Sequence, residues 1–573
     1  MKKLFLLFLI SLLVSNFFAQ DIPQHISYTR IYDFLDELAA DGLIELNSAI
    51  KPYSRSFITH KLIECQQQND KLSKRQQEEI TFFLNDYAPE TDKLPETRWN
   101  IWQNEHSKAA LIQPAFHYRD SLFRARITPI LGMQVVYNSK GNILQRWYGA
   151  EFQAMIGKHL SVFGSLRDLS NVGDSLSYQT YLNLAPGYQY KEASYGFDYS
   201  DSRGGIKYAN DWGSIGLVKD NIVWGDNSHG ANILSGRAPS FPMITLRLKP
   251  AKWFELNYFH AWLVSNVVDS TYYYVEDGTD KEYRPANKYM AANMFTFTPI
   301  QNLNLSVGNS IIYAERTIQV AYLIPIAFYK SLDHTLTKGL RTENQNSQLF
   351  MNFSSRNLKH THFFTSVFID EFSFSRLSPD NDEANPISYK LGAQVYDFPV
   401  SGLSFFAEFT RTNILNYKHS MPVLTYQSNG YNLGHYLGDN AQEIYFALQY
   451  KPLRGANLKL SYTNARHGNE YEYLRSGTSN GLTGSVRDII SQPSLGEIIW
   501  SDNTLGFEGI YEIINNAYAV FKCEYSDIQA FEPTKAAAFG EKRMTAQETL
   551  DYYTPDFLQG RNLTFTAGFS FGF

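Results

Sequence analysis

Two tyrosine clusters beside charged residues have side chains that suit the recognition of sugars. Tyr272, Tyr273 and Tyr274 form the first, and Tyr471 and Tyr473 form the second. A glycan packs its C–H faces on flat aromatic rings and offers hydroxyls to polar groups, and tyrosine supplies both with few rotatable bonds. Both clusters are therefore candidate ligand contacts. An aromatic girdle at lipid headgroups explains the same pattern equally well.

A third candidate lies in the segment 223–250, which reads VWGDNSHGANILSGRAPSFPMITLRLKP. Its side chains Trp224, Asp226, His229 and Arg237 could contact a glycan or another solute. The glycines of the segment permit tight turns, and its two early prolines lack the backbone donor that a regular central strand needs. We therefore expect an ordered loop that ends just before a strand at Ile244. A structural constriction without a ligand is the alternative.

Patterns for catalysis and metal binding are weaker. The 13 histidines are scattered, and His360 with His362 would give only two ligands on one face of a strand. Neither a GxGxxG motif nor a phosphate-binding loop occurs. We predict that the chain is not an enzyme and that it holds neither a cofactor nor a metal. The formal net charge of −6 argues against nucleic acid as a partner.

The elements that would position these residues begin after an export signal. Lys2 and Lys3 precede the apolar run Leu4 to Val14, and Ala19 offers a small residue for cleavage. The run is too short for a membrane-spanning helix, which needs about 20 residues. Residues 1–19 are therefore predicted to be a signal peptide. No later window is apolar enough for a helical membrane protein.

Residues 20–95 are predicted to form a small periplasmic helical domain. From 28 to 46 the apolar residues Ile31, Phe34, Leu35 and Leu38 recur at the spacing of one helix face. A second helix is expected from 56 to 68. Ser73 with Gln76 forms a capping box for a third helix.

From about residue 114 the period of the pattern changes to two. Leu303, Leu305 and Val307 alternate with Asn304 and Ser306, and several other segments repeat this alternation. An outer-membrane β-barrel needs it, because each strand has one face to lipid and the other to a wet lumen. Residues 96–573 are therefore predicted to be an all-β transmembrane barrel of about 16–18 antiparallel strands. Polar stretches at 269–285, 329–347, 377–386, 413–440 and 466–498 are expected to be outer loops.

Three arginines support the inward orientation of the polar face. Arg124, Arg126 and Arg247 lie opposite apolar neighbours in their strands. A cation facing lipid at mid-bilayer costs about 2–4 kcal/mol, so these side chains are expected to point into the lumen. A barrel this wide is either a channel or plugged by loops, and the segment around Trp224 is a candidate for folding inwards.

The C-terminal strand is the clearest case of alternation. From Asn562 to Phe573 every second residue is apolar, and the other face carries only small or polar residues without charge. An edge strand of a soluble sandwich would expose charges on that face. A terminal Phe573 on such a strand resembles the signal read by the barrel assembly machinery, which is thus an expected partner, as is outer-membrane lipid.

The segment with Trp224-Gly225, Asn232 to Gly236 and Pro239-Ser240-Phe241-Pro242 resembles the Wzi-type capsule assembly family, and Lys51-Pro52-Tyr53-Ser54-Arg55 is similar to that family's opening. The resemblance implies an 18-stranded outer-membrane barrel with a periplasmic helical bundle, so 18 strands are favoured within the range of 16–18. It also implies that the protein acts as a surface lectin. It would bind capsular or other surface polysaccharide and help in its assembly or retention. A porin or substrate-specific channel is the first alternative, and a scaffold of an envelope assembly or secretion complex is the second.

Overall fold

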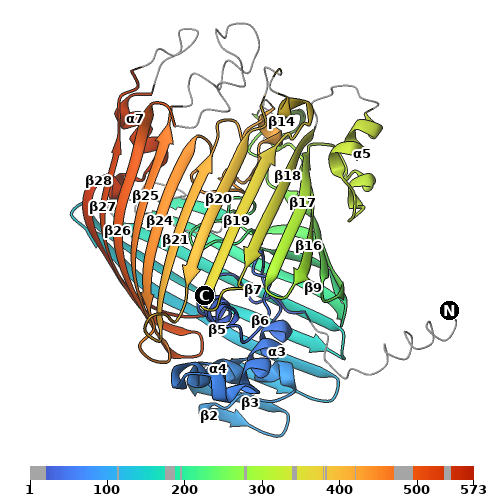
Figure 1. Cartoon of the computed structure of the whole chain (residues 1–573), viewed down its shortest axis with the longest axis vertical. Coiled ribbons are helices and arrows are strands. Elements are labelled where there is room, and N and C mark those ends of the chain that lie inside the picture. Colours follow the sequence, from blue (N-terminus) through green and yellow to red (C-terminus); the bar gives the residue numbers. More distant parts are fainter. Residues whose placement is uncertain are drawn as a thin grey trace, which may run out of the picture.

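The protein is a closed β-barrel with helices at one mouth (Figure 1). The computed structural model describes residues 21–572, apart from 113–114, 174–187, 194–195, 277–279, 338–344, 379, 381–383, 420, 470–494 and 535–543. The expected signal peptide and Phe573 lie outside this described part of the chain. Among the described residues, no helix has the length and apolar composition that crossing a bilayer requires.

The wall is a ring of 18 antiparallel strands, which confirms the predicted fold class and the favoured strand number. The ring closes where β28 pairs with β5, with Phe565 opposite Tyr137 and Phe571 opposite Leu131. In chain order its strands are β5 (Phe123–Asn138), β6 (Gly141–Ile156), β7 (Leu160–Gly173), β9 (Gly196–Asn210), β10 (Gly213–Asp220), β12 (Phe241–Ala251), β13 (Phe254–Leu263), β16 (Lys288–Ile300), β17 (Leu303–Tyr313), β18 (Gln345–Ser355), β19 (Thr361–Asp370), β20 (Ile387–Val395), β21 (Leu403–Thr412), β24 (Ala441–Tyr450), β25 (Ala456–Gly468), β26 (Ile498–Ile514), β27 (Ala517–Ala530) and β28 (Gly560–Phe571).

The exposure of alternate residues shows which face of each wall strand points outwards and which face points into the lumen. On β17, Leu305 and Val307 are 39% and 40% exposed, whereas Asn304 and Ser306 are buried. On β28, Phe565 is exposed on the outside while its polar neighbours Thr564 and Thr566 are buried. The apolar face therefore points outwards and the polar face into the lumen, the reverse of a soluble protein and the arrangement that a lipid surrounding requires.

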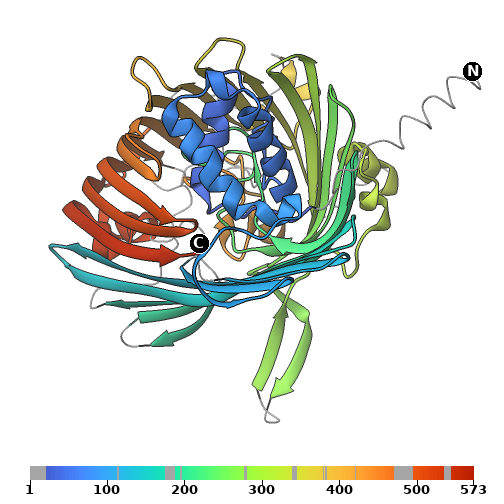
Figure 2. The same cartoon turned by 90° about the horizontal axis from the view of Figure 1, so that it is seen from below.

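The smaller elements extend the wall or connect its strands. A three-stranded sheet, β2 to β4, continues from the first part of β5, and β8 pairs with β9. A hairpin of β14 and β15 stands out from the rim at the end with the long connections (Figure 2). The bounds are β2 (Arg98–Gln103), β3 (Ser107–Ile112), β4 (Ala115–Arg119), β8 (Tyr188–Ala193), β14 (Val268–Glu276), β15 (Asp280–Pro285), α5 (Tyr329–Leu336), β22 (Gln427–Ser428), β23 (Tyr431–Asn432) and α7 (Ala546–Tyr553).

Residues 21–95, called here the helical region, contain three helices close to the predicted positions. They are α2 (Thr29–Ala40), α3 (Arg55–Gln66) and α4 (Lys74–Asp86). Ser73 and Gln76 form the predicted capping box of α4, and Ser54 caps α3. The apolar stripe of α2 packs against the other two helices, where Leu35, Leu62 and Ile80 are buried in one core.

The helical region sits inside the mouth of the barrel at the end where the strand connections are short (Figure 2). Buried ion pairs join it to these connections and to the wall. Lys451 Nζ lies 2.9 Å from Glu37, and Arg126 lies 2.9 Å from Asp86. The Arg126 and Arg55 charges hold the pKa of Asp86 at about 2, although burial alone would raise it. Charge pairing therefore fixes the helices in the mouth.

Two connections fold into the lumen above the helices. The inner loop (residues 221–240) joins β10 to β12, and the upper loop (residues 413–440) joins β21 to β24. The inner loop carries β11 (Val223–Trp224), which pairs with β1 (Ile50–Lys51) of the helical region. Tyr417 and Tyr426 of the upper loop donate to the carbonyls of Asn232 and Ile233 at 2.7 and 3.0 Å. The helical region and both loops together fill much of the barrel.

Strand β12 begins earlier than the sequence predicted. It starts at Phe241 instead of Ile244, and Pro242 pairs with Lys219 within it. Pro242 is the second residue of the strand, where the chain enters the wall from the inner loop, and a missing donor is tolerated at a strand start. The expected ordered loop is thus confirmed, but it is shorter at its C-terminal end.

Candidate functional site

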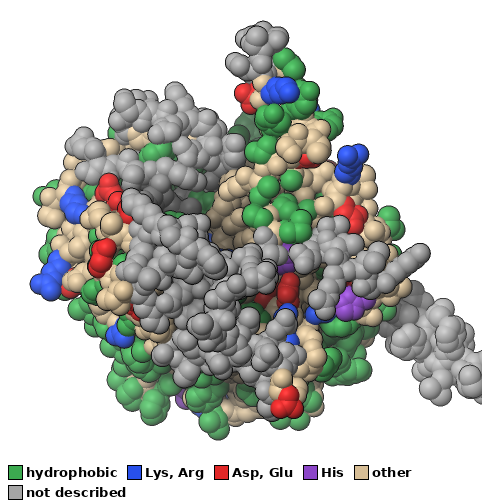
Figure 3. All heavy atoms as spheres, turned by 90° about the horizontal axis from the view of Figure 1, so that it is seen from above, with side chains coloured by type: hydrophobic (Ala, Val, Ile, Leu, Met, Phe, Trp, Pro, Cys, Tyr) green, Lys and Arg blue, Asp and Glu red, His purple; other side chains and the backbone are tan. Residues whose placement is uncertain are grey.

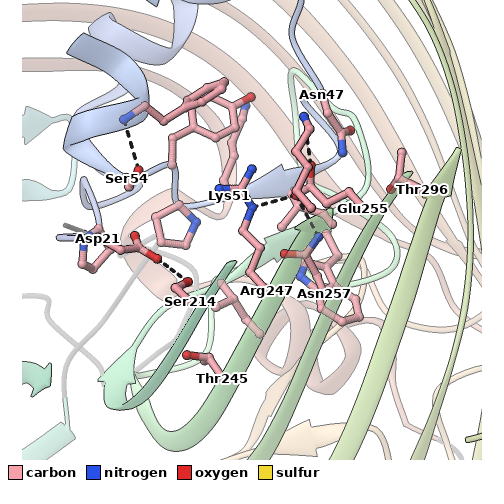
Figure 4. A pocket seen from close by; sticks show the side chains of 18 of the residues that line it. Asp21, Asn47, Lys51, Ser54, Ser214, Thr245, Arg247, Glu255, Asn257 and Thr296 are labelled. Atoms are coloured by element: carbon pink, nitrogen blue, oxygen red, sulfur yellow. Dashed lines mark hydrogen bonds and ion pairs between the residues drawn. The ribbon is translucent and has the colours of Figure 1, made fainter. Parts of the chain in front are cut away.

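A cavity of about 530 Å³ lies between the helical region and the wall strands β10, β12, β13, β16 and β17 (Figure 4). Its rim includes the exposed side chains of Glu45, in the helical region, and Lys252, in the short connection between β12 and β13. The cavity therefore opens at the end of the barrel that the helices occupy. Ligand pockets commonly have volumes of about 300–1,000 Å³, and this cavity falls in that range.

The wall side of the cavity is built by alternate residues of neighbouring strands. Arg247 of β12 donates to Glu255 of β13 at 2.9 Å, and Lys249 lies 3.4 Å from the same carboxylate. Asn257 also donates to Glu255, at 3.0 Å. Figure 4 shows Arg247, Glu255 and Asn257 between the wall strands and the helical region. The period of two that turns apolar residues to lipid turns this polar set inwards.

The other side of the cavity is formed by residues 45–54 and by the first described residue, Asp21. The Asp21 carboxylate binds Lys207 at 2.7 Å and accepts from Ser214 at 2.6 Å. Burial would raise the pKa of Asp21, but the Lys207 charge, the hydrogen bonds from Lys207 and Ser214 and the Arg247 charge together lower it. The Tyr53 ring packs against Tyr32, with 5.1 Å between centroids. These contacts give the cavity a rigid, partly aromatic face.

Two polar atoms of the cavity are buried without a partner. The Tyr53 hydroxyl and the Thr245 hydroxyl have no hydrogen-bond partner among the residues that the structure describes. Tyr53 is only 7% exposed. Buried polar groups are nearly always hydrogen-bonded in folded proteins. Aromatic surface, amides and hydroxyls in one recess suit a ligand with both C–H faces and hydroxyl groups.

The cavity brings together two of the residues singled out from the sequence. Trp224 and Arg247 both line it. Trp224 is 3% exposed and packs edge-on against Phe259 and Phe350, with centroids 5.0 and 5.8 Å apart. Its ring is mainly part of the core beneath the cavity. Arg247, by contrast, presents its guanidinium to the recess through its pair with Glu255.

The other candidates of the inner loop lie elsewhere in the lumen. Asp226 is buried, accepting from Asn352 at 2.7 Å. His229 stacks on Tyr445 at 4.3 Å between centroids, and its Nδ1 lies 3.1 Å from Glu443. Arg237 lies over the ring of Tyr436, 4.9 Å from its centroid. These contacts fix the inner loop against strands β18 and β24 and the upper loop, and none of the three residues lines the cavity.

The tyrosine clusters do not meet the cavity either. Tyr272, Tyr273 and Tyr274 lie on the projecting hairpin and are 57%, 47% and 53% exposed. The arginine Arg284 lies over Tyr272, 4.9 Å from its centroid. Figure 3 shows the exposed hydrophobic side chains of this hairpin standing out from the rim. Tyr471 and Tyr473 lie outside the described residues.

The remaining predicted arginines contact the helical region. Arg124 donates to the carbonyl of Pro89 at 2.8 Å, and Arg126 pairs with Asp86. His360 and His362 do not share a site, because His360 binds Asp41 at 2.7 Å while His362 bonds to Gln394 at 2.9 Å. In the described part of the chain, no group of three or more potential ligands could hold a metal.

Glu255, Thr245 and Tyr53 were missed as site residues by sequence reasoning. Glu255 could have been found, because a carboxylate near the start of an alternating strand needs a cation on the neighbouring strand. Thr245 lies on the polar face that was identified through Arg247. Tyr53 carries no such signal, since its place beside the wall depends on the docking of the helical region some 190 residues away in the sequence.

The closed wall with its outward apolar face defines an outer-membrane β-barrel whose lumen is occupied by its own N-terminal helices and loops. The family model described as capsule assembly protein Wzi matches residues 177–497, which is more than half of the chain. The protein therefore belongs to this family and is located in the outer membrane.

The fold agrees with that of a solved structure. The Escherichia coli protein Wzi, described as an outer membrane protein involved in group 1 capsule assembly and a carbohydrate-binding β-barrel, aligns with a TM-score of 0.56 at 11% identity, covering 97% of this chain and 100% of that chain. Acinetobacter baumannii OccAB1 aligns with a TM-score of 0.41 at 9% identity, over 78% of this chain and 96% of that chain. A search of curated protein sequences found no significant match.

Proposed function

We propose that this protein binds surface polysaccharide and helps to assemble or retain a capsule or other exopolysaccharide on the cell. Family membership supports this function, and the carbohydrate-binding described for the Escherichia coli structure is consistent with it. The structural observation that carries the proposal is the occupied lumen. Helices and two inward loops fill the barrel, yet a recess with aromatic, amide and hydroxyl groups remains.

The occupied lumen favours binding over transport. A porin needs a continuous aqueous path, whereas the upper loop, the inner loop and the helical region here contact one another along the barrel. The channel alternative therefore has less support. The contacts of α2 and α4 with the wall also leave less of the helical region for a partner, so the scaffold role stays a prediction.

Binding without catalysis is part of the proposal. The sequence contains two Gly-x-Ser-x-Gly patterns, one at 477–481, outside the described residues, and one at 568–572, at the end of strand β28. Such a pattern acts in hydrolysis only on a sharp strand-to-helix turn with a histidine nearby. If the protein only binds, polysaccharide incubated with the purified chain should keep its length distribution, and shortening of the polymer would contradict this part of the proposal.

A deletion strain tests the cellular role. Loss of the gene should leave the total polysaccharide unchanged but move it from the cell pellet to the medium, and the intact gene supplied on a plasmid should restore retention. Total polysaccharide measured in both fractions separates retention from synthesis. Unchanged retention in the deletion strain would overturn the proposal.

A further inference from the structure

We propose that the cavity between the helical region and β12–β13 is a saccharide-binding site, open on the periplasmic side, for a short neutral or weakly acidic stretch of glycan. This inference rests on the proposed function and gives it a location. It also gives the two ends of the barrel different roles. The long loops at the other end would contact polymer outside the cell. The cavity would meet glycan on the inner side of the membrane.

The position and size of the cavity permit such a ligand. Glu45 and Lys252 at the rim are exposed, so the opening is accessible at the end where the helices lie. A volume of about 530 Å³ accommodates a small molecule or a few linked rings and not a long polymer. A chain end or a short segment is therefore the form in which glycan would enter.

Two hydroxyls without partners among the described residues lie just beneath the surface of the cavity. Tyr53 and Thr245 come from opposite sides of the cavity, one from the helical region and one from the wall. Each is buried, and a buried hydroxyl that lacks a hydrogen bond destabilises the fold. Neither oxygen is exposed to the open space of the cavity, so a sugar hydroxyl would bond to Tyr53 or Thr245 after that side chain turns toward the ligand.

The charges of the cavity define the class of glycan. Arg247 and Lys249 share Glu255, and Lys207 pairs with Asp21. Most of the positive charge is therefore compensated within the site, and a strongly anionic ligand such as a polyphosphate would meet carboxylates as well as cations. A neutral or weakly acidic sugar suits this balance, because the paired groups can still accept or donate single hydrogen bonds to hydroxyls.

The test uses the purified full chain in detergent and tri- and tetrasaccharides obtained by mild hydrolysis of the polysaccharide that the parent cell exports. Calorimetry should show saturable binding to the unaltered protein. Tyr53→Phe and Thr245→Val each remove one hydroxyl and should weaken binding roughly three- to tenfold. Tyr289→Phe is the matched control, because it removes the hydroxyl of a buried tyrosine that does not itself line the cavity, and it should bind as the unaltered protein does.

The outcomes decide the inference separately from the proposed function. Fragment binding that is absent, or that Tyr53→Phe and Thr245→Val leave unchanged, overturns the cavity as the site. If the deletion strain still sheds its polysaccharide in that case, the proposed function stands and the glycan binds elsewhere. If the deletion strain retains its polysaccharide, the proposed function fails whatever the fragments do. Because Tyr53→Phe removes a hydroxyl without a partner, folding should be unaffected, and heat-modifiable gel migration checks this.

Discussion

Glu37 is the carboxylate through which helix α2 holds both a neighbouring helix and the wall. It is 1% exposed, lies 2.9 Å from Lys451 Nζ, accepts from Gln76 at 3.0 Å and forms an ion pair with Arg75. Glu37→Gln keeps the shape of the side chain and removes its charge. Two buried cations would then lose their main counter-charge, so the docking of the helical region should weaken.

The size of the effect follows from the environment of this carboxylate. Burial would raise the pKa of Glu37, but Lys451 and Arg75 lower it to about 2 from an ordinary value of 4.5. At about 1.4 kcal/mol per pH unit, the charged form is stabilised in the folded protein by roughly 3 kcal/mol. This agrees with the roughly 3–5 kcal/mol lost when one partner of a buried pair is removed. We expect Glu37→Gln to lower the opening free energy of α2 by about 3 kcal/mol.

Hydrogen exchange followed by mass spectrometry measures this directly on the detergent-solubilised protein. Amides of α2 should exchange faster in Glu37→Gln, while those of β17, on the far side of the cavity, should keep their rates. Glu78→Gln is the matched control, since Glu78 is half exposed and its pair with Lys74 spans 3.9 Å, and such pairs contribute about 0–1 kcal/mol. A loss below about 1 kcal/mol in Glu37→Gln, or equal losses in both variants, would refute the role given to the buried charges.

Three further predictions concern the helical region and the wall. The pKa of Asp86 is about 2, below its ordinary value of 3.8, so its ion pairs with Arg55 and Arg126 stabilise the fold fully above pH 4 and are lost as the pH falls toward 2. Pepsin should therefore release the helical region faster as the pH is lowered over that interval. A rate of release that stays constant would contradict this prediction. Val307→Arg places a cation on the lipid face and should cost about 2–4 kcal/mol in refolding into vesicles, whereas a negligible change would mean that this face does not meet lipid. Ser73→Ala removes the cap of α4 and should cost about 1 kcal/mol of local stability by hydrogen exchange, and unchanged protection of α4 would count against it.

The wall could be predicted because its rule is local. Side chains alternate between lipid and lumen within one strand, so Leu305 and Ser306 identify their faces without knowledge of the neighbouring strands. The same holds for the helices, where the spacing of Ile31, Phe34 and Leu38 and the capping box at Ser73 are encoded within a few turns. Chain length divided by the length of a spanning strand gave about 16–18 strands, and the family resemblance favoured 18.

The filling of the lumen could not be predicted to the same extent. The stretch 413–440 was expected to be an outer loop, but it folds inwards and packs on the inner loop through Tyr417 and Tyr426. The stretch 269–285 was expected to be a loop and forms a hairpin instead. Polar and glycine-rich composition marks both as connections, but it does not tell whether a connection turns outwards or inwards, because lumen and exterior are both polar surroundings.

Residues of the candidate site were predicted from the sequence only where the alternation within one strand identifies the side chains that face the lumen. Arg247 was identified because a cation opposite apolar residues must face the lumen. Its pairing with Glu255, eight residues later in the chain, follows from the register of β12 with β13, which a single sequence does not give. Aromatic and polar character alone selected Asp226, His229 and Arg237, and these residues hold the inner loop in place instead of lining the cavity.

Direct binding of polysaccharide to the purified protein is the measurement closest to the central claim. The full chain in detergent is immobilised, and purified polysaccharide from the parent cell is passed over it in biolayer interferometry. The account predicts saturable binding that free polysaccharide competes away, and no binding to a porin immobilised in the same way. Absence of binding, or equal binding to the porin, would contradict the claim that this occupied barrel recognises glycan.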